Sequence, residues 1–248
     1  MIRKQSDRSS MTNLVALGAM RTPEKGRSGT VPYPKKITDL LLASTLLLTL
    51  LPLMLLVALA IKCDSPGPVF YRQERVGLRG RRFAVLKFRS MRQDAEADGR
   101  PVWAAAQDHR ITRVGRFIRW ARIDELPQLL NVLLGDMSLI GPRPLLPEDQ
   151  PANTSLRLSV RPGITGWAQI NGAKLVTKDE KEKLDEWYVR NASFLVDMRI
   201  VLRTLCLALT SRLSSREMAA DAEQVRSKAL DLVAPSERWT TGKRGSMS

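Results

Sequence analysis

The chain contains few of the side chains that many catalytic sites require. It has one histidine, His109, and two cysteines, Cys63 and Cys206, among 248 residues. The cysteines lie far apart, beside or within apolar segments, which favours free thiols in a reduced compartment over a disulfide or a metal site. His109 stands among charged residues, where a solvated histidine is the expected state. The sequence therefore gives no support to a histidine or cysteine nucleophile.

Common nucleotide-binding and nucleic-acid-binding motifs are also absent. The sequence has neither a G-x-x-x-x-G-K-[ST] loop nor a G-x-G-x-x-G turn after a predicted strand. Aromatic residues make up only 5% of the chain, without zinc-finger spacing or an RNP-like run. The formal net charge of +15 suits nucleic acid, anionic lipid or phosphorylated substrates. The missing motifs leave nucleic acid a weak second.

One long apolar segment, residues 40–61, contains no charged residue. As a helix it would be roughly 33 Å long, enough to cross a bilayer core of about 30 Å. Lys35 and Lys36 precede it and Lys62 follows it, so the positive-inside tendency draws both ends toward the cytoplasm. Pro52, near the middle, removes a helix hydrogen bond. We predict a re-entrant helix–break–helix with both ends cytoplasmic; a kinked spanning helix is the alternative.

The next segments predict a small hairpin and an amphipathic helix. Residues 69–73 and 83–88 are β-prone and are separated by a loop with glycines, and the second strand leads into Lys87 and Arg89. Arginines at every third position in 108–122 lie opposite an apolar arc on a helical wheel. This pattern favours a helix in a membrane interface, with an ordinary surface helix as the alternative.

Two further helices are expected toward the C-terminus. Residues 178–191 form a charged helix, and residues 197–213 form an amphipathic helix that Asp197 is expected to cap. The fold class that these elements predict is α+β and mainly α. It comprises a re-entrant membrane helix–break–helix, a small β-hairpin and amphipathic interfacial helices around a site at the membrane surface.

Residues 119–144, RWARIDELPQLLNVLLGDMSLIGPRP, place two adjacent carboxylates, Asp124 and Glu125, between arginines. The leucines that follow have helical spacing, Pro127 is tolerated in a first turn, and Gly135 supplies a stop. Asp124 is a good N-cap residue, and the field of a helix N-terminus keeps a carboxylate ionised and attracts phosphate. Such a carboxylate can be a nucleophile or a Mg²⁺ ligand. Simple helix capping is the alternative.

Three motifs also carry a family resemblance. DELPQLLNVLLGDMSLIGPRP at 124–144, KFRSM at 87–91 and VRPGITGWAQING at 160–172 resemble the bacterial sugar transferases, which are monotopic phosphoglycosyl transferases. The resemblance implies transfer of a sugar 1-phosphate from a UDP-sugar to undecaprenyl phosphate, with release of UMP through an aspartyl phosphosugar intermediate. Such a step initiates exopolysaccharide, capsule or O-antigen assembly.

The resemblance also implies roles for particular residues. Asp124 is the implied nucleophile, Glu125 its catalytic neighbour, and Mg²⁺ the implied cofactor. The implied substrate-binding residues are Lys87, Arg89, Arg119, Pro142, Arg143 and Pro144, and the implied metal ligands are Asp124, Glu125 and Asp197.

Two positions depart from the family's pattern. Leu51 stands where members commonly carry a serine before the proline, so a hydroxyl that satisfies freed backbone groups is missing. Arg122 stands where serine is frequent, two residues before the aspartate. This arginine either adds a phosphate or lipid contact or only changes the interfacial face.

The resemblance and the patterns together predict four segments: a disordered basic tail at 1–34, a re-entrant membrane helix at 35–62, a catalytic domain at 63–213 and a polar tail at 214–248. The expected location is the bacterial inner (cytoplasmic) membrane, with the active site on its cytoplasmic face. The expected partners are a UDP-sugar, undecaprenyl phosphate and inner-membrane lipid, without nucleic acid; homo-oligomers and glycan-assembly enzymes stay open. A non-catalytic membrane scaffold is the competing class, and it leaves the carboxylates between arginine-bearing motifs unexplained.

Overall fold

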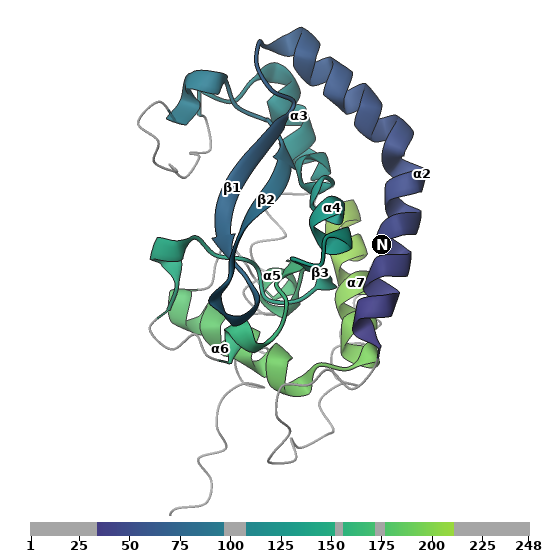
Figure 1. Ribbon diagram of the computed structural model, residues 1–248, viewed down its shortest axis with the longest axis vertical. Helices are drawn as coiled ribbons and strands as arrows, with labels where there is room; N and C mark the ends of the chain where they lie inside the picture. Colours follow the sequence, from purple (N-terminus) through teal and green to yellow (C-terminus); the bar gives the residue numbers. More distant parts are fainter. Residues whose placement is uncertain (1–33, 97–107, 152–155, 172–176, 211–248) are drawn as a thin grey trace, which may run out of the picture.

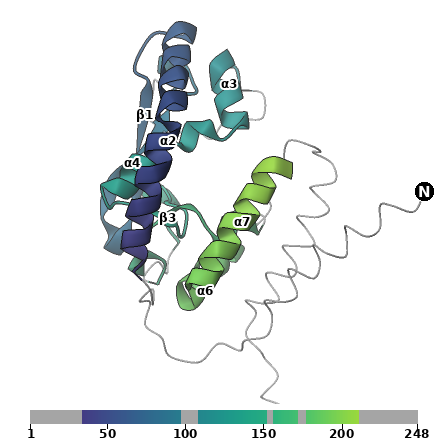
Figure 2. The same ribbon diagram turned by 90° about the vertical axis from the view of Figure 1, so that its right-hand side faces the viewer.

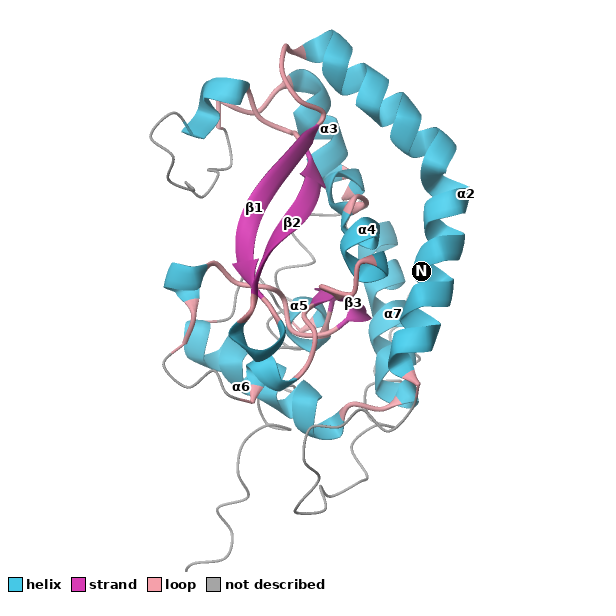
Figure 3. Cartoon of the chain, in the orientation of Figure 1, coloured by secondary structure: helices cyan, strands magenta, loops and turns pink. Residues whose placement is uncertain are grey.

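A computed structural model describes residues 34–96, 108–151, 156–171 and 177–210 (Figure 1). Both predicted tails lie outside these ranges, apart from Pro34. The described part is mainly helical, with two separate two-stranded sheets (Figure 3). This confirms the prediction of a mainly helical α+β fold.

The long N-terminal helix α2 (Lys35–Asp64) runs along one side of the protein (Figures 1 and 2). Among the described residues it is the one helix long and apolar enough to cross a membrane. One face of α2 packs on the rest of the protein through Ala43, Val57 and Ile61, which are at most 7% exposed. The opposite face exposes leucines, and Leu48 is 72% exposed. The protein body therefore covers only one side of this helix.

The predicted break at Pro52 is absent, because α2 continues through this residue as one helix that bends along its length (Figure 1). A proline removes a single N–H and crowds the preceding turn, which kinks a helix without ending it when the other hydrogen bonds remain. The helix–break–helix is thus wrong as a description of the backbone. The re-entrant topology stays a prediction.

Polar contacts fix both ends of α2 to the rest of the protein. Near the start, the buried carboxylate of Asp39 accepts the hydroxyl of Ser138 at 2.6 Å. At the end, the carboxylate of Asp64 accepts the backbone N–H of Val114 at 3.0 Å. The two ends of the apolar helix are therefore attached to the same body.

The predicted hairpin is confirmed. Strands β1 (Phe70–Val76) and β2 (Arg82–Phe88) pair antiparallel in the middle of the protein (Figure 1). The second edge of β2 is bound by the buried Asn131, whose amide accepts the N–H of Leu86 at 2.9 Å and donates to the carbonyl of Ala84 at 2.8 Å. A side-chain amide thus takes the place of a third strand and joins the hairpin to the next helix.

The amphipathic helix α3 (Arg113–Trp120) is shorter than the helix predicted for 108–122. Thr112 sets its start, because the Thr112 hydroxyl accepts the N–H of Gly115 at 2.9 Å, a typical N-cap bond. Its end is set by Arg122, whose φ of 59° lies in the left-handed region and turns the chain away from the helix. The cap at Thr112 and the backbone of Arg122 therefore set the two ends of α3, although the arginine pattern continues beyond both.

The apolar helix after the carboxylates is also shorter than predicted. The helix α4 spans Gln128–Leu133 and follows a separate 3₁₀ turn at Ile123–Glu125. The prediction of Asp124 as its N-cap is wrong: Asp124 lies in the 3₁₀ turn, and Pro127 occupies the cap position. A proline has no N–H to continue a helical ladder, so the regular helix begins after it. Gly135 has a φ of 82° and ends the helix as predicted.

One sheet has no counterpart among the predicted elements. Strands β3 (Ser138–Ile140) and β4 (Gly163–Thr165) pair in parallel. They approach so closely that a Cβ on Gly163 would lie 2.0 Å from the nitrogen of Gly141, which requires glycine there. This contact places the GPRP loop, residues 141–144, beside the turn that precedes β4.

Three helices complete the described fold. The charged helix α6 (Lys178–Asn191) is confirmed, and Thr177 and Glu180 form a capping box at its start. The helix α5 (Trp167–Ile170) is short, and α7 (Phe194–Thr210) starts before the predicted 197. Asp197 is therefore inside the first turn of α7 and does not cap it. These helices share one apolar core, and α7 lies next to the N-terminal part of α2 (Figure 1).

Candidate active site

The 3₁₀ turn carries Asp124 and Glu125 against the face of the hairpin. The left-handed backbone of Arg122 separates this turn from α3, and Pro127 separates it from α4. Neither Asp124 nor Glu125 therefore lies inside an α-helix. The two adjacent side chains face different surroundings, and this difference defines the site.

Glu125 is held by two cations. Its Oε1 accepts the Nη2 of Arg143 at 2.6 Å and the Nζ of Lys87 at 3.3 Å. The Glu125 side chain is 14% exposed. Burial alone would raise its pKa, but the charges of Arg143 and Lys87 outweigh burial and hold the pKa of Glu125 at about 2. Glu125 is therefore a fixed anion that joins the hairpin to the GPRP loop.

Asp124 behaves in the opposite way. Burial and the neighbouring charge of Glu125 raise the pKa of Asp124 above its ordinary value of 3.8. The cations Lys87, Arg119 and Arg122 offset part of this increase. The carboxylate of Asp124 lines a pocket of about 300 Å³. Asp124 is thus the less stabilised anion of the pair, and it lies at the edge of a cavity.

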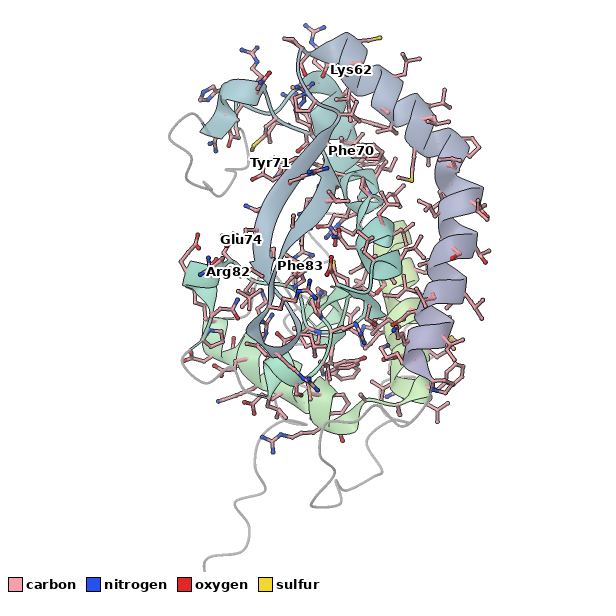
Figure 4. All side chains as sticks on the ribbon, in the orientation of Figure 1. Lys62, Phe70, Tyr71, Glu74, Arg82 and Phe83 are labelled. Atoms are coloured by element: carbon pink, nitrogen blue, oxygen red, sulfur yellow. The ribbon has the colours of Figure 1, made fainter. Side chains whose placement is uncertain are left out.

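One face of strand β1 lines the pocket. The sequence analysis did not predict this contribution. Tyr71, Gln73 and Arg75 line the pocket together with Lys87, which faces Tyr71 across the hairpin (Figure 4 labels Tyr71). Alternation along β1 was the available signal, since residues 71, 73 and 75 share one face of a strand. The strand therefore adds a cation, Arg75, to the site.

The structure brings together most of the predicted substrate-binding residues. Lys87 and Arg119 line the pocket, and Arg143 reaches Glu125 from the GPRP loop. Pro142 and Pro144 flank Arg143, and both of their carbonyls accept hydrogen bonds from outside the loop. The cluster of positive charge around the two carboxylates suits a diphosphate.

Arg89 has a different environment from the other predicted contacts. It lines the same pocket, yet it is only 6% exposed. Its guanidinium donates to the carbonyl of Ser65 at 2.8 Å and also to the carbonyl of Pro66, just after α2. These bonds tie the end of the apolar helix to the hairpin. Arg89 therefore has a structural role in addition to its place at the pocket.

Asp197 does not join Asp124 and Glu125. Its buried carboxylate accepts the hydroxyl of Tyr188 at 2.8 Å and forms an ion pair with Lys35 at the start of α2. Within the described ranges, no group of three or more histidine, cysteine, aspartate or glutamate side chains is arranged to hold a metal ion. The contacts of Asp197 therefore link α2 to α7, and the predicted three-carboxylate metal set is not assembled.

Comparison with known proteins identifies the family. Residues 31–211 match the family described as bacterial sugar transferase. Because this match covers more than half of the 248 residues, the chain belongs to the bacterial sugar transferase family.

Named relatives share most of this region. An undecaprenyl-phosphate glucose phosphotransferase of Komagataeibacter xylinus is 46% identical over 192 residues, which is 72% of this chain and 36% of that protein. A UDP-N-acetylgalactosamine-undecaprenyl-phosphate N-acetylgalactosaminephosphotransferase of Aeromonas hydrophila is 45% identical, over 72% of this chain and 44% of that protein. The exopolysaccharide production protein PSS of Rhizobium leguminosarum bv. phaseoli is 41% identical, over 71% of this chain and 95% of that protein. The chain thus spans less than half of the first two relatives and almost all of the third.

The opposite pKa shifts of the two carboxylates predict a specific response to a charge change. Arg119→Gln removes a cation that favours ionised Asp124, so the pKa of Asp124 should rise further above 3.8. Carbon-13 NMR of aspartate-labelled protein measures this pKa, and Asp124→Asn assigns the signal. Arg116→Gln, on the exposed face of the same helix, is the matched control and should leave the value unchanged. A lower pKa in Arg119→Gln would contradict the charge assignment.

Proposed function

We propose that this protein is a phosphoglycosyl transferase that moves a sugar 1-phosphate from a UDP-sugar to undecaprenyl phosphate and releases UMP. The observation that carries the proposal is the division of roles between adjacent carboxylates, with Glu125 fixed by Lys87 and Arg143 and Asp124 at the pocket. Membership of the family and the printed names of the relatives support this reaction type.

In the first step, a carboxylate oxygen of Asp124 attacks the β-phosphorus of the UDP-sugar. A new bond forms between this oxygen and phosphorus, and the bond from phosphorus to the oxygen bridging the two phosphates breaks. UMP leaves with the bonding electron pair, and an aspartyl phosphosugar remains on the enzyme. Burial of Asp124 supports this role, because a carboxylate that water stabilises poorly is a better nucleophile.

In the second step, an oxygen of undecaprenyl phosphate attacks the same phosphorus. The bond from phosphorus to Asp124 breaks, and the carboxylate is regenerated as an anion. The product is undecaprenyl diphosphate sugar. Two displacements at one phosphorus let a soluble donor and a membrane-bound acceptor use the same site at different times.

The cations of the site neutralise the donor's diphosphate. Arg143 and Lys87 are positioned by Glu125, and Arg119 lies on the pocket wall near Asp124. Mg²⁺ is bound in such sites by one or two carboxylates and by phosphate oxygens, and the adjacent pair Asp124 and Glu125 fits this donor set. Mg²⁺ held there would reduce the negative charge that opposes attack by a carboxylate. Asp197 is left out of this set, since the described residues contain no group of three or more carboxylate, histidine or cysteine side chains placed to hold a metal ion.

The surface of the protein supports a site at the inner membrane. Several helices expose large apolar side chains. These are the leucines on the outer face of α2, Phe117 and Trp120 on α3, and Leu195 on α7, and each is at least 39% exposed. Exposed apolar surface of this kind is unusual for a protein surrounded by water and typical of contact with lipid. The proposed pathway role is the first membrane step of exopolysaccharide, capsule or O-antigen assembly, on the cytoplasmic face.

The attachment of α2 supports a re-entrant topology. Asp39 near one end and Asp64 at the other end both bond to the same body. The buried face includes Ala43 in the first half and Met54, Val57 in the second half. A helix whose two ends both bond to one folded body is expected to have both ends on the same side of the membrane.

The first test compares the two carboxylates in purified protein supplied with a panel of UDP-sugars and undecaprenyl phosphate. Asp124→Asn should release no UMP, because the group that bonds to phosphorus is gone. Glu125→Gln should retain turnover that is lower by about 10²- to 10⁴-fold, the range for loss of a supporting acid–base or charge-holding group. The control is Glu74→Gln, which removes an exposed carboxylate paired with Arg82 at the far end of the hairpin (Figure 4). Wild-type turnover by Asp124→Asn would contradict the assigned roles.

The second test concerns topology. Cys63 and Cys206 are exposed, so both are first replaced by serine. A single cysteine is then introduced at Ser28 or Arg81, before and after the apolar helix. Both positions should react with an impermeant thiol reagent only from the cytoplasmic side of membrane vesicles. Labelling of either position from the periplasmic side alone would rule out the re-entrant arrangement.

A further inference from the structure

The GPRP loop, which presents Arg143, is held through consecutive backbone carbonyls. The carbonyl of Pro142 accepts the N–H of Gly163 at 2.9 Å, and the carbonyl of Leu145 accepts the N–H of Val76 at 3.1 Å. These two bonds attach the start of the loop to β4 and the residue directly after the loop to β1. The loop is therefore fixed at both sides of the arginine that binds Glu125.

Two arginine side chains hold the carbonyls between these positions. Arg75 donates to the carbonyl of Pro144 at 3.4 Å. Arg157 donates to the carbonyl of Arg143 itself. Arg75 lines the pocket, whereas neither Arg157 nor Arg143 is among the residues that line it. Arg157 thus contacts the residue whose guanidinium binds Glu125, behind the pocket wall.

A buried ion pair orients Arg157. Its Nε donates to the carboxylate of Asp185 on α6 at 2.9 Å, and the two residues are 3% and 1% exposed. A buried pair of this kind adds little net stability, because the cost of removing both charges from water is close to the gain from their attraction. Stability alone therefore does not account for a pair placed at this point, and the bond to the Arg143 carbonyl gives it a further role.

We propose that the Arg157–Asp185 pair positions the Arg143 side chain for its contact with Glu125. This inference rests on the proposed transferase function. A continuous series of contacts runs from Asp185 to Arg157, to the carbonyl of Arg143, and through the Arg143 guanidinium to Glu125. Neither Arg157 nor Asp185 contacts the substrate in this scheme. They act through the placement of the loop.

The geometry requires arginine at position 157. A guanidinium presents its Nε and its Nη groups in a rigid plane, so it serves Asp185 on one edge and the carbonyl of Arg143 on another. A lysine ammonium is a single point charge on a flexible stem and does not reproduce this bridge. Arg157→Lys therefore keeps the charge beside Asp185 and removes the fixed link to the loop.

A double-mutant cycle tests the coupling. Arg157→Lys should lower kcat/KM for the UDP-sugar by about 10²-fold, as expected for misplacement of a catalytic group by about 1 Å. In a background of Arg143→Ala, the same change should have almost no further effect, because the arginine to be positioned is already gone. The matched control is Arg161→Lys, since Arg161 also donates to a backbone carbonyl, that of Gly135 at 2.8 Å, but outside the loop. Additive losses in the double variant would overturn the proposal.

A second variant separates positioning from folding. Arg157→Met combined with Asp185→Leu removes both buried charges, a replacement that is often neutral or stabilising. The melting temperature should then stay near that of the wild type, while kcat/KM falls as in Arg157→Lys. A variant that retains wild-type kcat/KM would show that the pair does not position Arg143.

Hydrogen exchange gives a readout that does not depend on turnover. The amide of Gly163 bonds to the loop, that of Val76 bonds to Leu145 directly after the loop, and that of Gly141 bonds to Thr165. Their exchange should become at least 10-fold faster in the Arg157→Met, Asp185→Leu variant, and exchange in α2 should be unchanged. Unchanged exchange at all three amides would contradict the proposal. If the wild type releases no UMP while the variant shows the faster exchange, the transferase function is contradicted. The structural role of the pair in holding the loop would then still stand.

Discussion

The ion pairs of Glu125 with Arg143 and Lys87 are the contacts on which the site depends. They join three parts of the chain, namely the 3₁₀ turn, the hairpin and the GPRP loop, at one carboxylate oxygen. Because the two cations are used by Glu125, that carboxylate stays ionised and its neighbour Asp124 receives less compensation for its burial. One glutamate therefore holds three parts of the chain together and contributes to the unequal charge stabilisation of the pair.

The apolar helix α2 and the site are joined by direct contacts. The hairpin that carries Lys87 continues into Arg89, which bonds to the residues directly after α2. The opposite end of α2 is attached through Lys35 to Asp197, on a helix that also contributes to the C-terminal core. Any arrangement of α2 in a membrane therefore fixes the orientation of the pocket relative to the lipid surface. This linkage gives a physical reason why the proposed soluble donor and lipid acceptor would meet at one site.

The sequence predicted the parts of the fold that depend on local pattern. The hairpin followed from β-prone residues around a glycine-containing loop, and α6 followed from its charged helical pattern. The role of Asp197 was not visible, because its partner Lys35 lies 162 positions away in the chain. Arg157 and Asp185 were missed as a pair for the same reason. Local signals also failed at Asp124, where Pro127 and the left-handed Arg122 set the helix limits in place of the expected cap.

In the proposed reaction Asp124, and not Glu125, forms the bond to phosphorus. The most direct measurement incubates the protein with a radiolabelled UDP-sugar that it uses, without undecaprenyl phosphate, and locates the label by mass spectrometry of acid-quenched peptides. One equivalent of UMP and a phosphosugar on Asp124 are expected, and this label should transfer to undecaprenyl phosphate when the lipid is added. A label on Glu125, or release of UMP only when both substrates are present, would contradict the role of Asp124 as the nucleophile.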